Sequence, residues 1–138
     1  MKTIDPYLIF NGNCRQAMEF YANCLGGDLN IQTYAQSPGE HPDAVKDKIM
    51  HAKLTKGQIV IMASDPHDGS PVTQGNSFFL NLNCDSLEEI ERVFKSVGKN
   101  GKVLLPLQDM FWGARFGMLT DQFGVNWMFS FELETKEE

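Results

Sequence analysis

The two halves of this chain carry the same order of predicted helices and strands. A short apolar run at residues 6–10 ends in a turn, and a helical pattern with apolar residues at three- and four-residue spacing follows it. A similar run at residues 77–83 precedes a second helical pattern, and an offset of 72 places Leu8 on Leu80 and Gly26 on Gly98. Three strand patterns follow each helix, so each half predicts a βαβββ module.

The local signals also predict where these elements begin and end. Asn11 or Asn13 is expected to cap the first helix, and Asp85 or Ser86 the second. The polar stretch 35–47 contains two prolines and a glycine, which predicts a mobile loop. The remaining strands are predicted at residues 28–34, 48–55, 58–63, 102–106, 112–120 and 125–131.

A length of 138 residues predicts one domain, built of two modules at 1–65 and 76–132. The fold class is α+β. A module of four strands and one helix leaves one sheet face bare, so two modules side by side can curl their bare faces around a shared cleft. An ordinary α+β sandwich is the alternative. The acidic tail from Glu132 is expected to fray.

The composition excludes several classes of partner. A net charge of −6 disfavours binding to the phosphates of nucleic acid. No apolar run approaches the roughly 18–20 residues that cross a bilayer. We also expect no secretory signal at the N-terminus. Three cysteines without a Cys-x-x-Cys pair are typical of reduced thiols. We therefore expect a cytoplasmic protein with neither a nucleic-acid nor a membrane partner.

Motifs at both ends of the chain resemble those of a known family. They lie at residues 6–13, 17–21 and 25–27, and again at 112–117 and 121–127. In this order and spacing they resemble the glyoxalase/bleomycin-resistance (vicinal oxygen chelate) superfamily, and the PhnB-like branch in particular. The resemblance implies paired βαβββ modules that form a cupped sheet, a homodimer, and a cleft in which metal-dependent members hold a divalent ion through His and Glu.

The positions that match the family's metal ligands carry other residues. They are Tyr7, Ile61, Phe79 and Met128, each with an uncertainty of one residue. None of these side chains is a usual ligand of a divalent ion that prefers imidazole, carboxylate or thiolate. The histidines, His41, His51 and His67, show no ligand spacing. We therefore expect no metal ion and no cofactor.

Alternation along the strands predicts which side chains face the cleft, because successive residues of a strand point to opposite faces. Leu8, Leu80, Leu82, Trp127 and Phe129 are expected under the helices. His51 is a partly exposed strand histidine, a hydrogen-bonding group or base in the pocket, or a metal ligand. Arg115 holds either a ligand anion or an ion pair. The candidate ligand-binding residues are Tyr7, Ile9, His51, Ile61, Phe79, Asn81, Arg115, Met118, Asn126 and Met128.

Two main functional hypotheses follow, with a third behind them. The first is a metal-free homodimer that binds a small, partly apolar molecule in its cleft. The second is an enzyme of the lyase, isomerase or dioxygenase type, which either holds a metal at other residues or uses His51 and Tyr7 for proton transfer. The third is a scaffold whose dimer surface is the whole function. PhnB-like sequences are sometimes labelled 3-demethylubiquinone methyltransferases, but the chain lacks a glycine-rich cofactor loop, and no catalytic residue is assigned.

Overall fold

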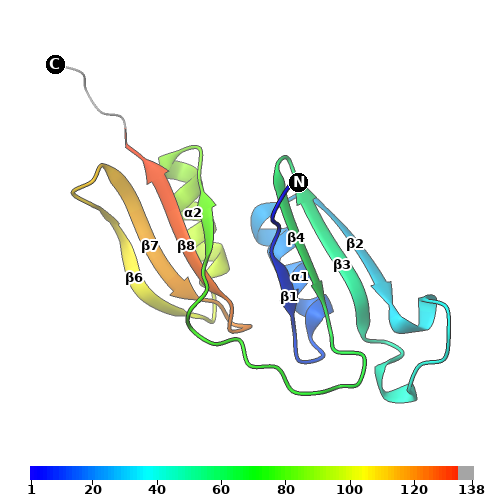
Figure 1. The fold of residues 1–138 in the computed structure, drawn as a ribbon. Coiled ribbons are helices and arrows are strands. Elements are labelled where there is room, and N and C mark those ends of the chain that lie inside the picture. Colours follow the sequence, from blue (N-terminus) through cyan, green and yellow to red (C-terminus); the bar gives the residue numbers. More distant parts are fainter. Residues whose placement is uncertain (134–138) are drawn as a thin grey trace. The chain divides into compact units, whose positions relative to one another are not determined.

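The computed structural model describes residues 1–133, and its contacts divide the chain into two compact units, Met1–Thr73 and Gln74–Glu138 (Figure 1). Each unit has the order strand, helix and three strands that the repeated pattern predicts. That the two modules make one domain stays a prediction. The end of the acidic tail, residues 134–138, lies outside the described residues. No helix among residues 1–133 is long and apolar enough to span a bilayer.

The first unit is a four-stranded mixed sheet with one helix across one face (Figure 1). Its strand order is β1-β4-β3-β2, in which β1 runs parallel to β4 and the other pairs are antiparallel. The loop after β2 contains two 3₁₀ turns, Tyr34–Gln36 and Asp43–Val45, and Val45 is buried. The main elements are β1 (Tyr7–Ile9), α1 (Cys14–Leu25), β2 (Asp28–Thr33), β3 (Ile49–Lys56) and β4 (Ile59–Ser64).

The second unit repeats this topology. Its strand order is β5-β8-β7-β6, and β5 runs parallel to β8. This confirms the α+β class and the two βαβββ modules. The strand predicted from residue 77 begins at Leu80, and the one predicted to end at 106 continues to Asp109. The elements are β5 (Leu80–Asn83), α2 (Leu87–Val97), β6 (Lys102–Asp109), β7 (Ala114–Thr120) and β8 (Asn126–Glu132).

The helix ends follow the sequence at three of four points. Gly26 ends α1 with a φ of 81°, and Gly98 ends α2. The Ser86 hydroxyl accepts a hydrogen bond from the Glu89 backbone N–H at 3.1 Å, which confirms the second cap. At the start of α1, Asn13 occupies the predicted N-cap position, but its side chain makes no capping hydrogen bond.

Each sheet has one face covered by its helix and one open face, and the cores lie between helix and sheet. In the first unit the tightly buried set includes Phe10, Ala17, Met18, Tyr21, Ile49, Ala52, Leu54 and Ala63. In the second unit it includes Ile90, Val93, Val97, Leu119, Trp127 and Phe129. Leu80 and Leu82 pair with Trp127 and Phe129, so both lie under α2 as the alternation predicts. The open faces are therefore the surfaces on which the candidate residues must be sought.

Candidate functional site

The open face of the first sheet is defined by the register of its central hairpin. Met62 pairs with Lys53 of β3 and with Tyr7 of β1, so these three residues share the open face. Ile61 instead pairs with Leu54, which is fully buried, and is itself only 4% exposed. The prediction that Ile61 faces the cleft is therefore wrong. Met62, the next residue, lies on the open face instead.

Two polar candidates meet on this open face. The Tyr7 hydroxyl lies 3.1 Å from Nδ1 of His51, and the two ring centroids are 5.7 Å apart. Tyr7 comes from the edge strand β1 and His51 from β3, so the contact spans β4. Tyr7 remains 45% exposed, and Ile9 beside it is also exposed. The pair therefore presents a phenol and an imidazole next to apolar surface that solvent can reach.

The open face of the second sheet carries a methionine pair. Met118 of β7 pairs with Met128 of β8, and Met128 also pairs with Asn81 of β5. Both methionines are half-buried and Asn81 is exposed. Phe116 lies on the same face, two residues from Met118. The structure thus brings together three of the predicted residues from three strands.

Asn126 and Phe79 lie at the border of this face. Asn126 is 7% exposed, and its side-chain nitrogen donates to the carbonyl oxygens of Gly75 and Phe78, each at 3.1 Å. Its side-chain oxygen accepts from the Thr120 hydroxyl at 2.8 Å. Both amide hydrogens are therefore used to hold the segment before β5 against β8. Phe79 is half-buried in that segment.

Arg115 lies on the opposite, helix-covered face of β7, since it pairs with Phe131. Its Nε donates to Asp109 Oδ1 at 2.8 Å, and one terminal nitrogen lies 3.1 Å from Glu91 of α2. The hydrogen bond from Arg115 lowers the pKa of the Asp109 carboxyl below its usual value. Of the two roles weighed for Arg115, the geometry favours the ion pair.

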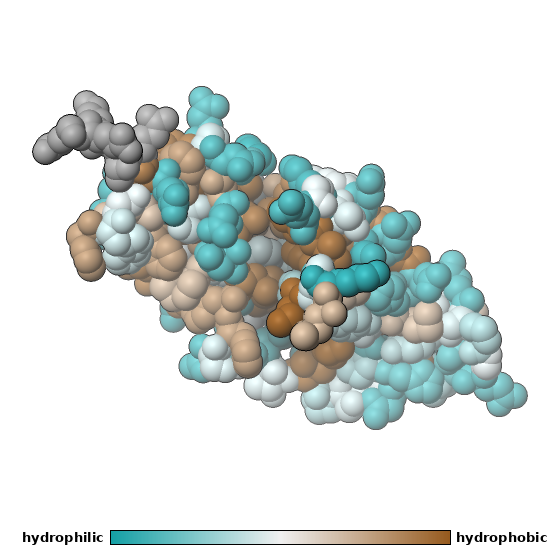
Figure 2. All heavy atoms as spheres, turned by 45° about the horizontal axis from the view of Figure 1, so that its top comes forward, coloured by the Kyte–Doolittle hydropathy of each residue, from teal (hydrophilic) through white to brown (hydrophobic). Residues whose placement is uncertain are grey.

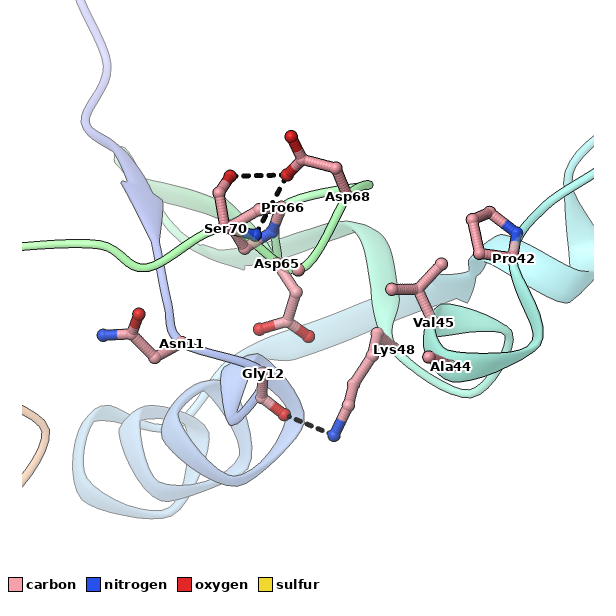
Figure 3. Close-up of a pocket in the computed structure, with 11 residues that line it drawn as sticks. Asn11, Gly12, Pro42, Ala44, Val45, Lys48, Asp65, Pro66, Asp68 and Ser70 are labelled. Carbon is pink, nitrogen blue, oxygen red and sulfur yellow. Dashed lines mark hydrogen bonds between the residues drawn. The ribbon is translucent and has the colours of Figure 1, made fainter.

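A pocket that the sequence did not indicate lies within the first unit (Figure 3). It has a volume of about 250 Å³ and is lined by the loop before β3, the start of α1 and the segment after β4. The Lys48 ammonium donates to the Gly12 carbonyl at 3.1 Å on one side of it. Asp65, only 2% exposed, accepts from the backbone N–H of Cys14 at 3.1 Å and of Ile49 at 3.0 Å. Asp65 therefore supplies the side-chain acceptor at the start of α1 that the sequence predicts from an asparagine.

Figure 2 shows hydrophobic residues at the molecular surface among polar ones. Several large apolar side chains are exposed, and two of them lie in the hairpin between β6 and β7. Phe111 is almost fully exposed at the tip of the β6–β7 hairpin, and Trp112 beside it is more than half exposed. The Trp112 ring packs edge-on against Phe116, with centroids 5.9 Å apart. This aromatic group extends the apolar surface beyond the start of β7.

Comparison with known proteins identifies the family. The sequence profile of the Glyoxalase/Bleomycin resistance protein/Dioxygenase superfamily matches residues 3–129. The chain belongs to this superfamily. It is 34% identical to protein YjdN of Escherichia coli, over 91% of this chain and 92% of that protein.

Solved structures of related proteins agree with this assignment. The crystal structure of PA1353 from Pseudomonas aeruginosa shares 46% identity and a TM-score of 0.88, covering 97% of this chain and all of that one. A PhnB protein from Bacillus cereus, provisionally named a 3-demethylubiquinone-9 3-methyltransferase, shares 26% identity and a TM-score of 0.77, covering 94% and 99%. The resemblance to the PhnB-like branch is therefore confirmed.

The family's metal site does not fit the side chains of this chain. The positions matched to the family's ligands carry phenol, thioether and phenyl side chains, from Tyr7, Met62 (in place of Ile61), Met128 and Phe79. Imidazole and carboxylate ligands, which divalent ions prefer, do not occur among them. Within residues 1–133, no three His, Cys, Asp or Glu side chains come together in a metal-binding group. These side chains therefore do not suit a divalent ion bound in the manner of the family's metal-dependent members.

Proposed function

We propose that this protein is a homodimer that binds a small, partly apolar molecule against the open faces of its sheets, without chemical turnover. The observation that carries the proposal is the pairing of Met118 with Met128 on a face where Asn81 is exposed. Methionine is flexible and polarizable, so it can adapt to ligands of several shapes. Ligand sites are typically apolar with a few polar groups that fix orientation, and this face has that composition.

The first unit supplies the same combination. Tyr7 and Ile9 offer apolar surface, and the Tyr7–His51 pair offers hydrogen-bonding atoms. A phenol bonded to an imidazole can donate to a carbonyl of a ligand, and can donate to or accept from a hydroxyl. Apolar burial would supply most of the affinity, at about 25 cal/mol for each Å² removed from water, and the polar pair would supply selectivity.

A screen of small aromatic and heteroaromatic compounds tests the binding proposal. Thermal melts should show a saturable rise in melting temperature, because a ligand that binds only the folded state stabilises it by mass action. Met128→Ala should weaken the selected ligand about five- to tenfold, since it removes apolar contact surface. Arg115→Gln, on the covered face, is the matched control and should leave the affinity unchanged. Sedimentation equilibrium tests the homodimer.

The alternative is an enzyme, and the Tyr7–His51 contact of 3.1 Å is the observation that favours it. His51 could accept the phenol proton while Tyr7 acts on a substrate proton, which is general acid–base catalysis. Tyr7→Phe distinguishes the two functions because it removes only the hydroxyl. In the binding protein this variant alters affinity modestly and there is no product. In the enzyme it abolishes turnover while ligand binding persists.

A further inference from the structure

The fold brings together two histidines that lie 26 residues apart in the sequence. His41 stands in the loop after β2, and His67 in the segment after β4. His41 Nδ1 lies 3.1 Å from His67 Nε2, and the rings meet nearly perpendicular, at 76°. Two ring nitrogens therefore face each other at hydrogen-bond distance, although the sequence offers no ligand spacing for them.

The hydrogen bonds around His41 determine which of its nitrogens carries the proton. The Ser37 hydroxyl donates to the Tyr34 carbonyl oxygen at 2.9 Å, and it has only one hydrogen to give. With that hydrogen on the Tyr34 carbonyl, the Ser37 oxygen accepts the 2.8 Å bond from His41 Nε2. In neutral His41 the lone pair then lies on Nδ1, the atom that faces His67. Metal-binding histidines are commonly oriented in this way by a bond from the other ring nitrogen.

A buried tyrosine supports both imidazole rings. The Tyr34 ring lies 5.6 Å from His41 and 5.1 Å from His67, centroid to centroid. Tyr34 is only 7% exposed, and its hydroxyl donates to the Asp65 carbonyl oxygen at 2.6 Å. Because Tyr34 is fixed by packing and by this bond, it limits the positions that the two rings can take.

We propose that His41 Nδ1 and His67 Nε2 bind one divalent transition-metal ion, such as Zn²⁺, Cu²⁺ or Ni²⁺, with water in the remaining positions. Two nitrogens about 2.0–2.1 Å from a tetrahedral ion lie about 3.3 Å apart, so the pair must separate only slightly. Imidazole selects these ions over Mg²⁺ and Ca²⁺, which prefer oxygen. His67 is exposed, so its Nε2 proton can pass to Nδ1 through water when the ion binds.

The ion would join the two chain segments that line the pocket of Figure 3. Pro42 and Val45 follow His41 along one wall, and Pro66 and Asp68 flank His67 on the other. A metal bridge between the segments would restrict their movement and stabilise the folded first unit. Neither histidine is among the residues proposed to bind the small molecule, so the inference goes beyond the proposed ligand binding and does not depend on it.

Titration calorimetry of the untagged full-length chain with Zn²⁺ tests the site. One ion per chain is expected, and His41→Ala and His67→Ala should each weaken binding by at least about tenfold. His51→Ala is the matched control, because His51 lies on the open face against Tyr7, and it should change the affinity less than about twofold. Unchanged affinity in His41→Ala or His67→Ala, or an equal loss in His51→Ala, would overturn the proposal.

A measurement on the unsubstituted chain removes the risk that a variant fails to fold. Substoichiometric Cu²⁺ should broaden the imidazole proton resonances of His41 and His67 and spare those of His51. Equal broadening of all three would show adventitious surface binding and refute the site. Ser37→Ala retains both ligands but removes the acceptor for His41 Nε2, so it should weaken Zn²⁺ about tenfold. The nitrogen shifts of metal-free His41 should show the proton on Nε2, and a proton on Nδ1 would refute the orientation argument.

Discussion

The buried carboxylate of Asp65 is predicted to be the contact on which the first unit depends most. Its two oxygens accept from the backbone N–H of Cys14, at the start of α1, and from that of Ile49, at the start of β3. Cys14 and Ile49 are both buried, so water cannot replace the carboxylate at either amide. Asp65 therefore satisfies donors from a helix and a strand that lie 51 and 16 residues away.

An Asp65 variant loses folding stability because it leaves these two backbone donors without an acceptor. A buried N–H that loses its partner costs about 1–3 kcal/mol, and removing an anion at a helix N-terminus costs about 0.3–1 kcal/mol more. Asp65→Ala should therefore lower the free energy of unfolding by about 3–5 kcal/mol. Asp65→Asn should lower it by about 2–3 kcal/mol, because one oxygen remains but an NH₂ group faces the other donor. Asp68→Ala is the matched control.

Urea denaturation followed by circular dichroism measures these losses, and amide hydrogen exchange locates them. Asp68 is exposed and accepts hydrogen bonds from Ser70 within its own turn, so its replacement should change stability by about 0.5 kcal/mol or less. Exchange at Cys14 and Ile49 should accelerate in Asp65→Asn and not in Asp68→Ala. Equal losses for the two alanine variants would refute the reasoning.

Three further predictions follow from single contacts. The hydrogen bond from Arg115 lowers the pKa of Asp109. The stability that this bond contributes is therefore fully present above the ordinary carboxyl pKa, and it is lost as the pH falls through the lowered pKa. In Arg115→Gln the NMR titration of Asp109 should therefore move upward, and an unmoved titration would contradict the contact. Burial raises the pKa of the Cys14 thiol to about 12, so iodoacetamide at pH 8 should modify it more than about tenfold faster in urea than in the native protein. A Cβ on Gly117 would lie 2.8 Å from the Phe94 ring of α2, so Gly117→Ala should cost about 1–3 kcal/mol in thermal melts. An unchanged melting temperature would show that α2 shifts freely.

The repeated βαβββ order was predictable because every signal that defines it is local. Alternation in β8 placed Trp127 and Phe129 on one face, and the β5–β8 pairing confirms that they share it with Leu80 and Leu82. Helix ends marked by glycine need only a residue that tolerates a positive φ, as at Gly26. Such signals depend on a few neighbouring residues, so they survive without knowledge of the tertiary structure.

The face of β4 could not be derived in this way. The sequence offers the continuous apolar run 59–63, in which period-two alternation is invisible, and the comparison with Met128 selected Ile61. The register is set by the hydrogen-bond ladder with β3, where Leu54 pairs with Ile61 and Lys53 with Met62. A shift of one residue exchanges the two faces of a strand. An error of one position therefore selected Ile61, which lies in the core, in place of Met62 on the open face.

The polar groups of the first unit escaped prediction for a different reason: their partners come from distant segments. A cap for α1 was sought beside the helix, yet the acceptor is Asp65, supplied from beyond β4. The same return of the chain brings His67 to His41, so one crossing of two segments creates both the cap and the histidine pair. Spacing rules for metal sites assume ligands on one helix or one turn, and they do not detect ligands on separate loops. The proton lies on His41 Nε2 when the Ser37 hydroxyl donates to the Tyr34 carbonyl. The backbone path of the loop, which places Ser37 beside Tyr34, therefore determines which His41 nitrogen is left to bind a metal ion.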